Sequence, residues 1–152
     1  MCDYSLHGLK NRLAQVNDSL VVYRFKTGTT GLASPREVRE SQEYYERKTS
    51  LGGRIARKFV LSEREPVVCP VCIPDGAILV IGNVPETIQK FYDVGEQEEV
   101  VFRQLTQEEY RHRDGFEFRN GTRVSLQEFE NGVNLKVLAL ESESSPVEHI
   151  YR

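Results

Sequence analysis

The sequence predicts a mainly β (α+β) fold, a small antiparallel barrel or sandwich of about seven strands with one or two peripheral helices. Short runs rich in β-branched and aromatic residues recur along the chain, and glycine or Asn-Gly turns separate them. Only one stretch carries a full helix-start signal. The chain has 152 residues, a length typical of one domain, so we expect residues 1–152 to fold as a single domain.

The first predicted strand covers residues 20–25, Leu-Val-Val-Tyr-Arg-Phe. Its β-branched and aromatic side chains favour an extended backbone, and Gly28 follows as a turn residue. A short strand over residues 13–16 is the expected hairpin partner, because Asn17 and Asp18 supply turn chemistry between the two runs.

A helix is predicted over residues 35–48. Ser34 is the expected N-cap, Pro35 occupies the first helical position, and Glu37 places an acidic side chain in the first turn. The apolar stripe of this helix is thin and includes Val38. We therefore expect a surface helix that contacts a protein partner or a second copy of the chain.

Residues 54–61 follow two glycines and carry three basic residues beside an apolar face. They predict either a further helical turn or a strand. We interpret the basic residues as a solvated face, with an anion or partner patch as the alternative.

The most apolar segment is residues 77–81, Ala-Ile-Leu-Val-Ile, which follows a Pro-Asp-Gly turn at residues 74–76. A strand that is apolar on both faces is predicted to be central and covered on each side. A short helix is expected to begin near Pro85 and to stop near Gly95.

Four further strands are predicted in the second half of the chain. Residues 99–105 form the first, and residues 116–126 form a hairpin around Asn120 and Gly121. An Asn-Gly pair between alternating runs predicts a two-residue type I′ turn. A second Asn-Gly pair precedes the strand over residues 133–140, so the two hairpin strands and this strand are expected to form a three-stranded meander.

Charge and hydropathy exclude some function classes. The formal net charge of −3 and the pI near 5.7 provide no overall positive field, which disfavours nucleic-acid binding. No apolar run approaches the length of about 20 residues that spans a bilayer, and the first residues lack a secretory signal pattern. We expect a soluble, cytoplasmic protein without a membrane partner.

A Cys-Pro-Val-Cys motif at Cys69 and Cys72 is the main chemical signal. Cysteines at this spacing supply two ligands of a tetrahedral zinc or iron site from one turn. The chain has only three cysteines, so the other ligands must come from elsewhere, and Cys2 and His7 are the leading candidates. The sequence predicts a thiolate-rich metal site that is catalytic if one coordination position stays open. The further ligand candidates are His112, His149 and Asp3.

Other interpretations of the cysteines stay open. Cys69 and Cys72 would be core residues in a non-catalytic interaction module, because free cysteines are often buried. They would alternatively cycle between dithiol and disulfide as a redox pair. In a thiol-dependent enzyme, Cys72 would be the nucleophile with His7 or His112 as the base.

Three segments resemble those of small, uncharacterised bacterial proteins. They are the opening Met-Cys-Asp-Tyr-Ser-Leu, residues 31–35 and residues 71–77. The resemblance spans most of the chain. No activity is established for that group, so the resemblance implies a bacterial, cytoplasmic setting but no catalytic residue.

Overall fold

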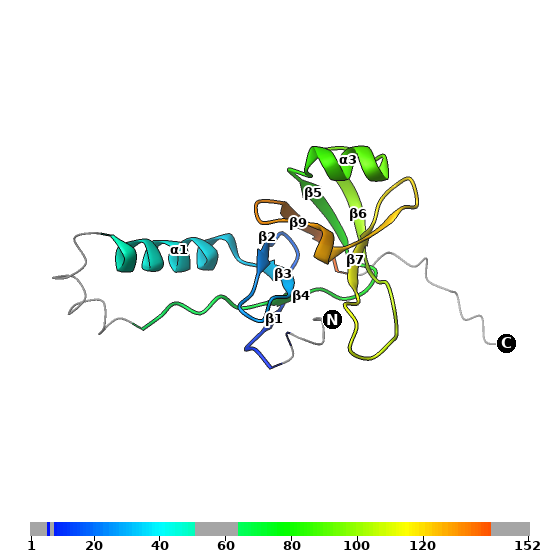
Figure 1. Cartoon of the computed structure of the whole chain (residues 1–152). Helices are drawn as coiled ribbons and strands as arrows, with labels where there is room; N and C mark the ends of the chain where they lie inside the picture. Colours follow the sequence, from blue (N-terminus) through cyan, green and yellow to red (C-terminus); the bar gives the residue numbers. More distant parts are fainter. Residues whose placement is uncertain (1–5, 7, 51–63, 141–152) are drawn as a thin grey trace.

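The structure, a computed structural model, describes residue 6 and residues 8–50 and 64–140 (Figure 1). Its elements follow the chain in the order β1 (Arg12–Leu13), β2 (Ser19–Arg24), β3 (Thr30–Ala33), α1 (Pro35–Thr49), β4 (Val71–Cys72), β5 (Ile78–Gly82), α3 (Glu86–Tyr92), β6 (Glu98–Gln104), β7 (Asp114–Glu117), β8 (Arg123–Ser125), the 3-10 turn η2 (Leu126–Glu128) and β9 (Asn134–Ala139).

Seven strands form one sheet in the order β3-β2-β9-β5-β6-β7-β8. Every neighbouring pair in it is antiparallel. The prediction of a mainly β fold with an antiparallel sheet and peripheral helices is confirmed at this level. The predicted hairpin between residues 13–16 and β2 is wrong. β1 instead pairs in parallel with β4, with Arg12 opposite Val71.

A side chain connects the two ends of the sheet. β3 lies at one end, and η2 directly follows β8 at the other. The carboxamide of Gln127 accepts a hydrogen bond from the Thr30 N–H at 3.0 Å and donates one to the Thr30 carbonyl at 2.8 Å. Within the described residues, no backbone ladder closes the sheet into a barrel. The amide of Gln127 therefore takes the place of a neighbouring strand at Thr30.

The core lies on the inner face of β5, β6, β7 and β9. Leu79, Phe102 and Val137 are fully buried there, because successive strand residues point to opposite faces. The Phe116 ring packs edge to face against Phe102 and Phe129, with centroid distances of 5.8 and 5.6 Å. β5 is central, as predicted, but it is not covered on both faces. Its alternate residues Ile78 and Val80 are only partly buried.

The hairpin between β7 and β8 has a different turn from the predicted one. Gly121 has a φ of +83°, whereas Asn120 has no positive φ. Gly121 N–H donates to the Phe118 carbonyl at 2.9 Å, and Phe118 N–H donates to the Thr122 carbonyl at 2.9 Å, so the loop has three residues. The Asn120 amide is used elsewhere, because it donates to two carbonyls at the end of α3.

The two helices begin where the sequence predicts. α1 follows Ser34 and has Pro35 in its first turn, although the Ser34 side chain makes no capping bond. α3 follows Pro85 and ends at Tyr92, before the predicted stop at Gly95, and its C-cap residue Asp93 has a left-handed φ of 54°. No described helix has the length and apolarity needed to cross a membrane. The predictions for residues 54–61 lie outside the described residues.

α1 projects away from the sheet, and residues 64–70 return beside it (Figure 1). We call α1 and residues 64–70 together the arm. Only Ser41 and Tyr44 are buried in the helix. The arm therefore meets the body of the protein mainly at its base, where α1 contacts β2.

Candidate functional site

The Cys-Pro-Val-Cys motif lies where the arm returns to the sheet. Cys69 is a partly exposed free thiol whose Sγ donates to the Lys10 carbonyl at 2.7 Å. Its backbone N–H donates to Glu37 Oε2 at 2.9 Å. Cys72 is only 6 % exposed, and its sulfur belongs to a disulfide. Since Cys69 is free, the two motif cysteines are not joined to each other.

The surroundings of Cys69 favour the protonated thiol. Burial raises the pKa of this thiol, and the negative charge of Glu37 raises it further, against a smaller opposing effect of Lys10 and Arg12. Thiolate is the form that attacks electrophiles and binds metals. Cys69 is thus a weaker nucleophile and ligand at neutral pH than an ordinary cysteine.

The predicted metal ligands are only partly within the described residues. Cys2 and His7 lie outside them, as do the further candidates Asp3 and His149. His112 is exposed. In residues 8–50 and 64–140, no group of three or more His, Cys, Asp or Glu side chains is placed to hold a metal ion. The zinc or iron site at Cys2, Cys69, Cys72 and His7 stays a prediction.

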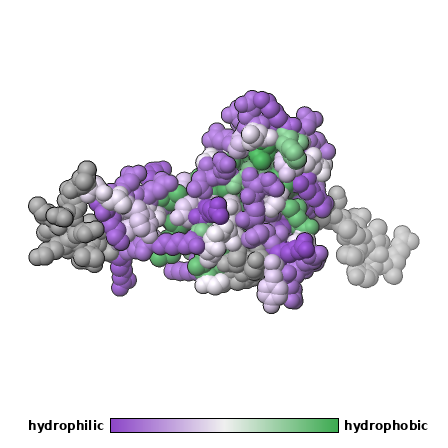
Figure 2. Space-filling model, in the orientation of Figure 1, coloured by the Kyte–Doolittle hydropathy of each residue, from purple (hydrophilic) through white to green (hydrophobic). Residues whose placement is uncertain are grey.

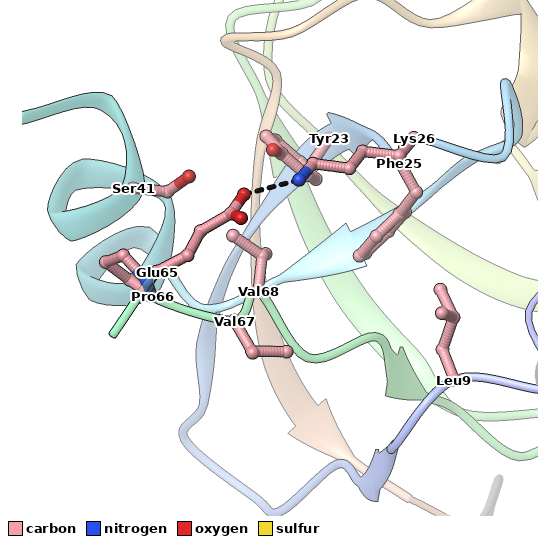
Figure 3. A pocket seen from close by; sticks show the side chains of 9 residues that line it. All are labelled: Leu9, Tyr23, Phe25, Lys26, Ser41, Glu65, Pro66, Val67 and Val68. Carbon is pink, nitrogen blue, oxygen red and sulfur yellow. Dashed lines mark hydrogen bonds and ion pairs between the residues drawn. The ribbon is translucent and has the colours of Figure 1, made fainter. Parts of the chain in front are cut away.

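A cavity of about 220 Å³ lies between α1, the end of β2 and the returning segment (Figure 3). We call it the arm pocket. Most of its walls are apolar, and Ser41 on α1 is the small buried side chain that leaves space for it. The lining residues are Leu9, Tyr23, Phe25, Lys26, Ser41, Glu65, Pro66, Val67 and Val68.

Three polar side chains from different elements meet beside the arm pocket. The carboxylate of Glu65 accepts hydrogen bonds from Lys26 Nζ and from the Tyr45 hydroxyl. Lys26 Nζ also lies 5.6 Å from the centre of the Tyr45 ring, at the distance of a cation–π contact. This rim cluster of Lys26, Tyr45 and Glu65 joins the β2–β3 turn to both halves of the arm.

The rim cluster fixes the charges of its members. The hydrogen bonds that Glu65 accepts, first from Lys26 and then from Tyr45, lower the pKa of Glu65. The contacts of Lys26 with Glu65 and then with Tyr45 raise the pKa of Lys26. Lys26 is therefore a cation and Glu65 an anion at neutral pH. The pocket thus has an apolar floor and two opposite charges side by side at its edge.

Local sequence explains how these side chains are positioned. Lys26 lies in a three-residue turn in which Gly28 adopts a φ of +85° and Phe25 N–H donates to the Thr29 carbonyl. Pro66 directly follows Glu65 and keeps the chain out of a helical conformation. Figure 2 shows mostly hydrophilic residues over α1, with hydrophobic surface where the helix meets the sheet.

Sequence reasoning missed the arm pocket. Its signal is the apolar pair of Val67 and Val68 just before the cysteine motif, which sequence patterns alone would assign to a strand. In the structure Val67 is exposed and Val68 is half-buried. Lys26 and Glu65 are 39 positions apart, so nothing in the sequence indicates that they meet.

Comparison with known proteins adds no further information, because no protein family, curated protein or solved structure matches the chain. The fold and the site together define a mainly β protein with a projecting helical arm and an apolar pocket at the base of that arm.

Proposed function

We propose that the protein is a non-catalytic binding module, in which the arm pocket accepts an apolar side chain of a protein partner. The curled sheet serves as a barrel-like support whose two ends are held together through Gln127. One observation carries the proposal. A largely apolar cavity remains between the arm and the sheet, and the side chains of the described residues do not fill it.

The size of the arm pocket favours a side chain over a cofactor. Pockets for cofactors and drug-sized ligands typically measure about 300–1,000 Å³. Cavities of about 150 Å³ already hold a molecule the size of benzene. At about 220 Å³, the arm pocket matches one large aliphatic or aromatic side chain.

The chemistry of the lining residues supports binding over catalysis. A lysine acts as a nucleophile or base only when it loses its proton, and the contacts of Lys26 with Glu65 and Tyr45 favour the protonated form. Among the described residues that line the pocket, Ser41 and Tyr23 carry hydroxyl groups that could act as nucleophiles. None of the described histidines lines the arm pocket to activate either hydroxyl.

The proposal is tested by titrating ¹⁵N-labelled protein with N-acetyl-phenylalanine amide, a probe that carries one aromatic side chain. We expect the amide signals of Lys26, Ser41 and Val68 to shift together and to saturate with one dissociation constant. Shifts scattered over the whole sheet, or no saturable shift, would contradict the proposal.

A pocket-filling variant provides the matched control. In Ser41→Leu a larger apolar side chain occupies the cavity, so the probe should bind at least about tenfold more weakly. Gln42→Leu makes the same kind of change at the adjacent, exposed position, which does not line the arm pocket, and should leave binding unchanged. Circular dichroism checks that both variants retain α1.

A further inference from the structure

We infer that the occupant of the arm pocket is a second copy of this chain, in a symmetric dimer in which Val67 of each copy enters the arm pocket of the other. The inference rests on the proposed function, because it uses the same pocket. It goes further by naming the partner and the side chain that enters.

A projecting side chain and a cavity lie next to each other at this site. Val67 is 72 % exposed although it is apolar, and it stands at the edge of the arm pocket (Figure 3). A two-fold axis beside Val67 brings this side chain over the partner's cavity and the partner's Val67 over the first cavity. Such self-complementarity is what a symmetric dimer requires, since both copies use the same surface.

The charges at the rim have the same self-complementary arrangement. Lys26 and Glu65 carry opposite charges side by side at the pocket edge. The same two-fold axis places Lys26 of each copy near Glu65 of the other, which makes an alternating group of four charges. Complementary charges fix the register of an interface more than they add affinity, so the burial of Val67 supplies the attraction.

The rest of the arm does not oppose association of two copies. α1 carries four basic and four acidic side chains, so the two helices have no net repulsion. A helix with so few buried residues also gains by being covered, because most of the stability of a helix in a protein comes from packing of its apolar face. A second arm provides that cover.

The first experiment is analytical ultracentrifugation of the full chain from low to high micromolar concentration. We expect a reversible monomer–dimer equilibrium. Val67→Asp should raise the dimer dissociation constant at least about tenfold, because a carboxylate would enter the apolar pocket. Phe91→Asp changes a similarly exposed apolar residue on α3, 80 % exposed and absent from the pocket lining, and should leave the constant unchanged.

A charge-exchange experiment separates contacts between copies from contacts within one copy. Lys26→Glu and Glu65→Lys should each weaken self-association about tenfold, since each places like charges across the two-fold axis. A mixture of the two variants should form a heterodimer, because every pair across the axis is then attractive. Sedimentation of a fluorescently labelled Lys26→Glu protein with unlabelled Glu65→Lys measures it.

The outcomes distinguish this inference from the proposed function. A wild-type protein that stays monomeric, or a dimer that Val67→Asp leaves intact, overturns the dimer. The absence of a heterodimer in the mixture overturns the proposed contacts between Lys26 of one copy and Glu65 of the other. The binding function survives each of these results if N-acetyl-phenylalanine amide still saturates the arm pocket, and fails separately if it does not.

Discussion

The sheet and the arm differ in how much of their side-chain surface is buried. In the sheet, side chains such as Leu79, Phe102 and Phe116 are fully enclosed and pack on neighbours far apart in sequence. In the arm, α1 buries only Ser41 and Tyr44, and its exposed faces carry charges. The sheet is thus stabilised by burial within one chain, whereas the arm keeps apolar surface available at its base. We infer that the sheet is the support and the arm is the part that interacts.

The largest expected effect breaks the sheet. Phe116→Ala removes a fully buried ring from between Phe102 and Phe129 and should lower the free energy of unfolding by about 3–5 kcal/mol. Tyr44→Ala in the arm should cost less, because a loosely attached element can detach locally without unfolding the sheet. Urea denaturation followed by circular dichroism compares the two variants. Equal losses would contradict the division into support and arm.

The next effect concerns the link between the two ends of the sheet. Gln127→Leu leaves the N–H and carbonyl of Thr30, a residue only 8 % exposed, without the amide that satisfies them. We expect a loss of about 1–3 kcal/mol of unfolding free energy, as for buried polar groups left unpaired. Gln107→Leu, at an exposed position, is the control and should change stability little. A loss no larger than that of the control would show that Gln127 does not hold the ends together.

The difference in burial between sheet and arm also explains which elements can be predicted from the sequence. Alternating apolar residues and glycine turns revealed most strands, because burial on one face imposes a period of two on β2, β6 and β9. The pairing of β1 with β4 was missed. A two-residue strand has too few side chains to show a period, and its partner lies almost 60 positions away, with Arg12 opposite Val71.

The turn at Asn120 and the site were harder to predict for a different reason. The Asn-Gly pair indicated a hairpin correctly, but the turn type depends on the contact of Asn120 with the end of α3. The arm pocket depends on Lys26, Ser41 and Glu65, which come from separate elements. Such contacts follow from the tertiary fold and leave no local pattern. The cysteine motif does leave a local pattern, and that pattern predicts a metal site and not the arm pocket.

A smaller effect concerns Cys69, at the junction of arm and sheet. Burial and Glu37 raise the pKa of this thiol, so iodoacetamide should alkylate it more slowly in the folded protein than in urea at pH 8. The folded-state rate should rise as the pH approaches the raised pKa. Mass spectrometry of tryptic peptides measures both rates at this residue. Faster alkylation in the folded state would instead favour a thiol-dependent enzyme.

Metal analysis of the purified protein tests the predicted zinc or iron site. In the disulfide form of the structure, the sulfur of Cys72 is not a thiolate, so a metal centre requires its reduction. If the motif cysteines are core residues instead, protein purified with a reductant and without added metal should carry less than about half an equivalent of zinc or iron. A full equivalent that is lost in both Cys69→Ser and Cys72→Ser would establish the metal site and remove the case for core cysteines.

The smallest effect is a pH dependence confined to the arm. Because the contacts with Lys26 and Tyr45 hold the pKa of Glu65 below its ordinary value of 4.5, these contacts stabilise the arm at neutral pH and are lost as the pH falls through the lowered pKa. Hydrogen exchange of the α1 amides should therefore accelerate at acid pH relative to the amides of β5, after correction for intrinsic rates. Glu65→Gln should remove this difference, whereas Glu43→Gln, exposed on α1, should retain it. An acid-induced change that is equal in the arm and the sheet, or that persists in Glu65→Gln, would mean that the rim cluster does not hold the arm in place.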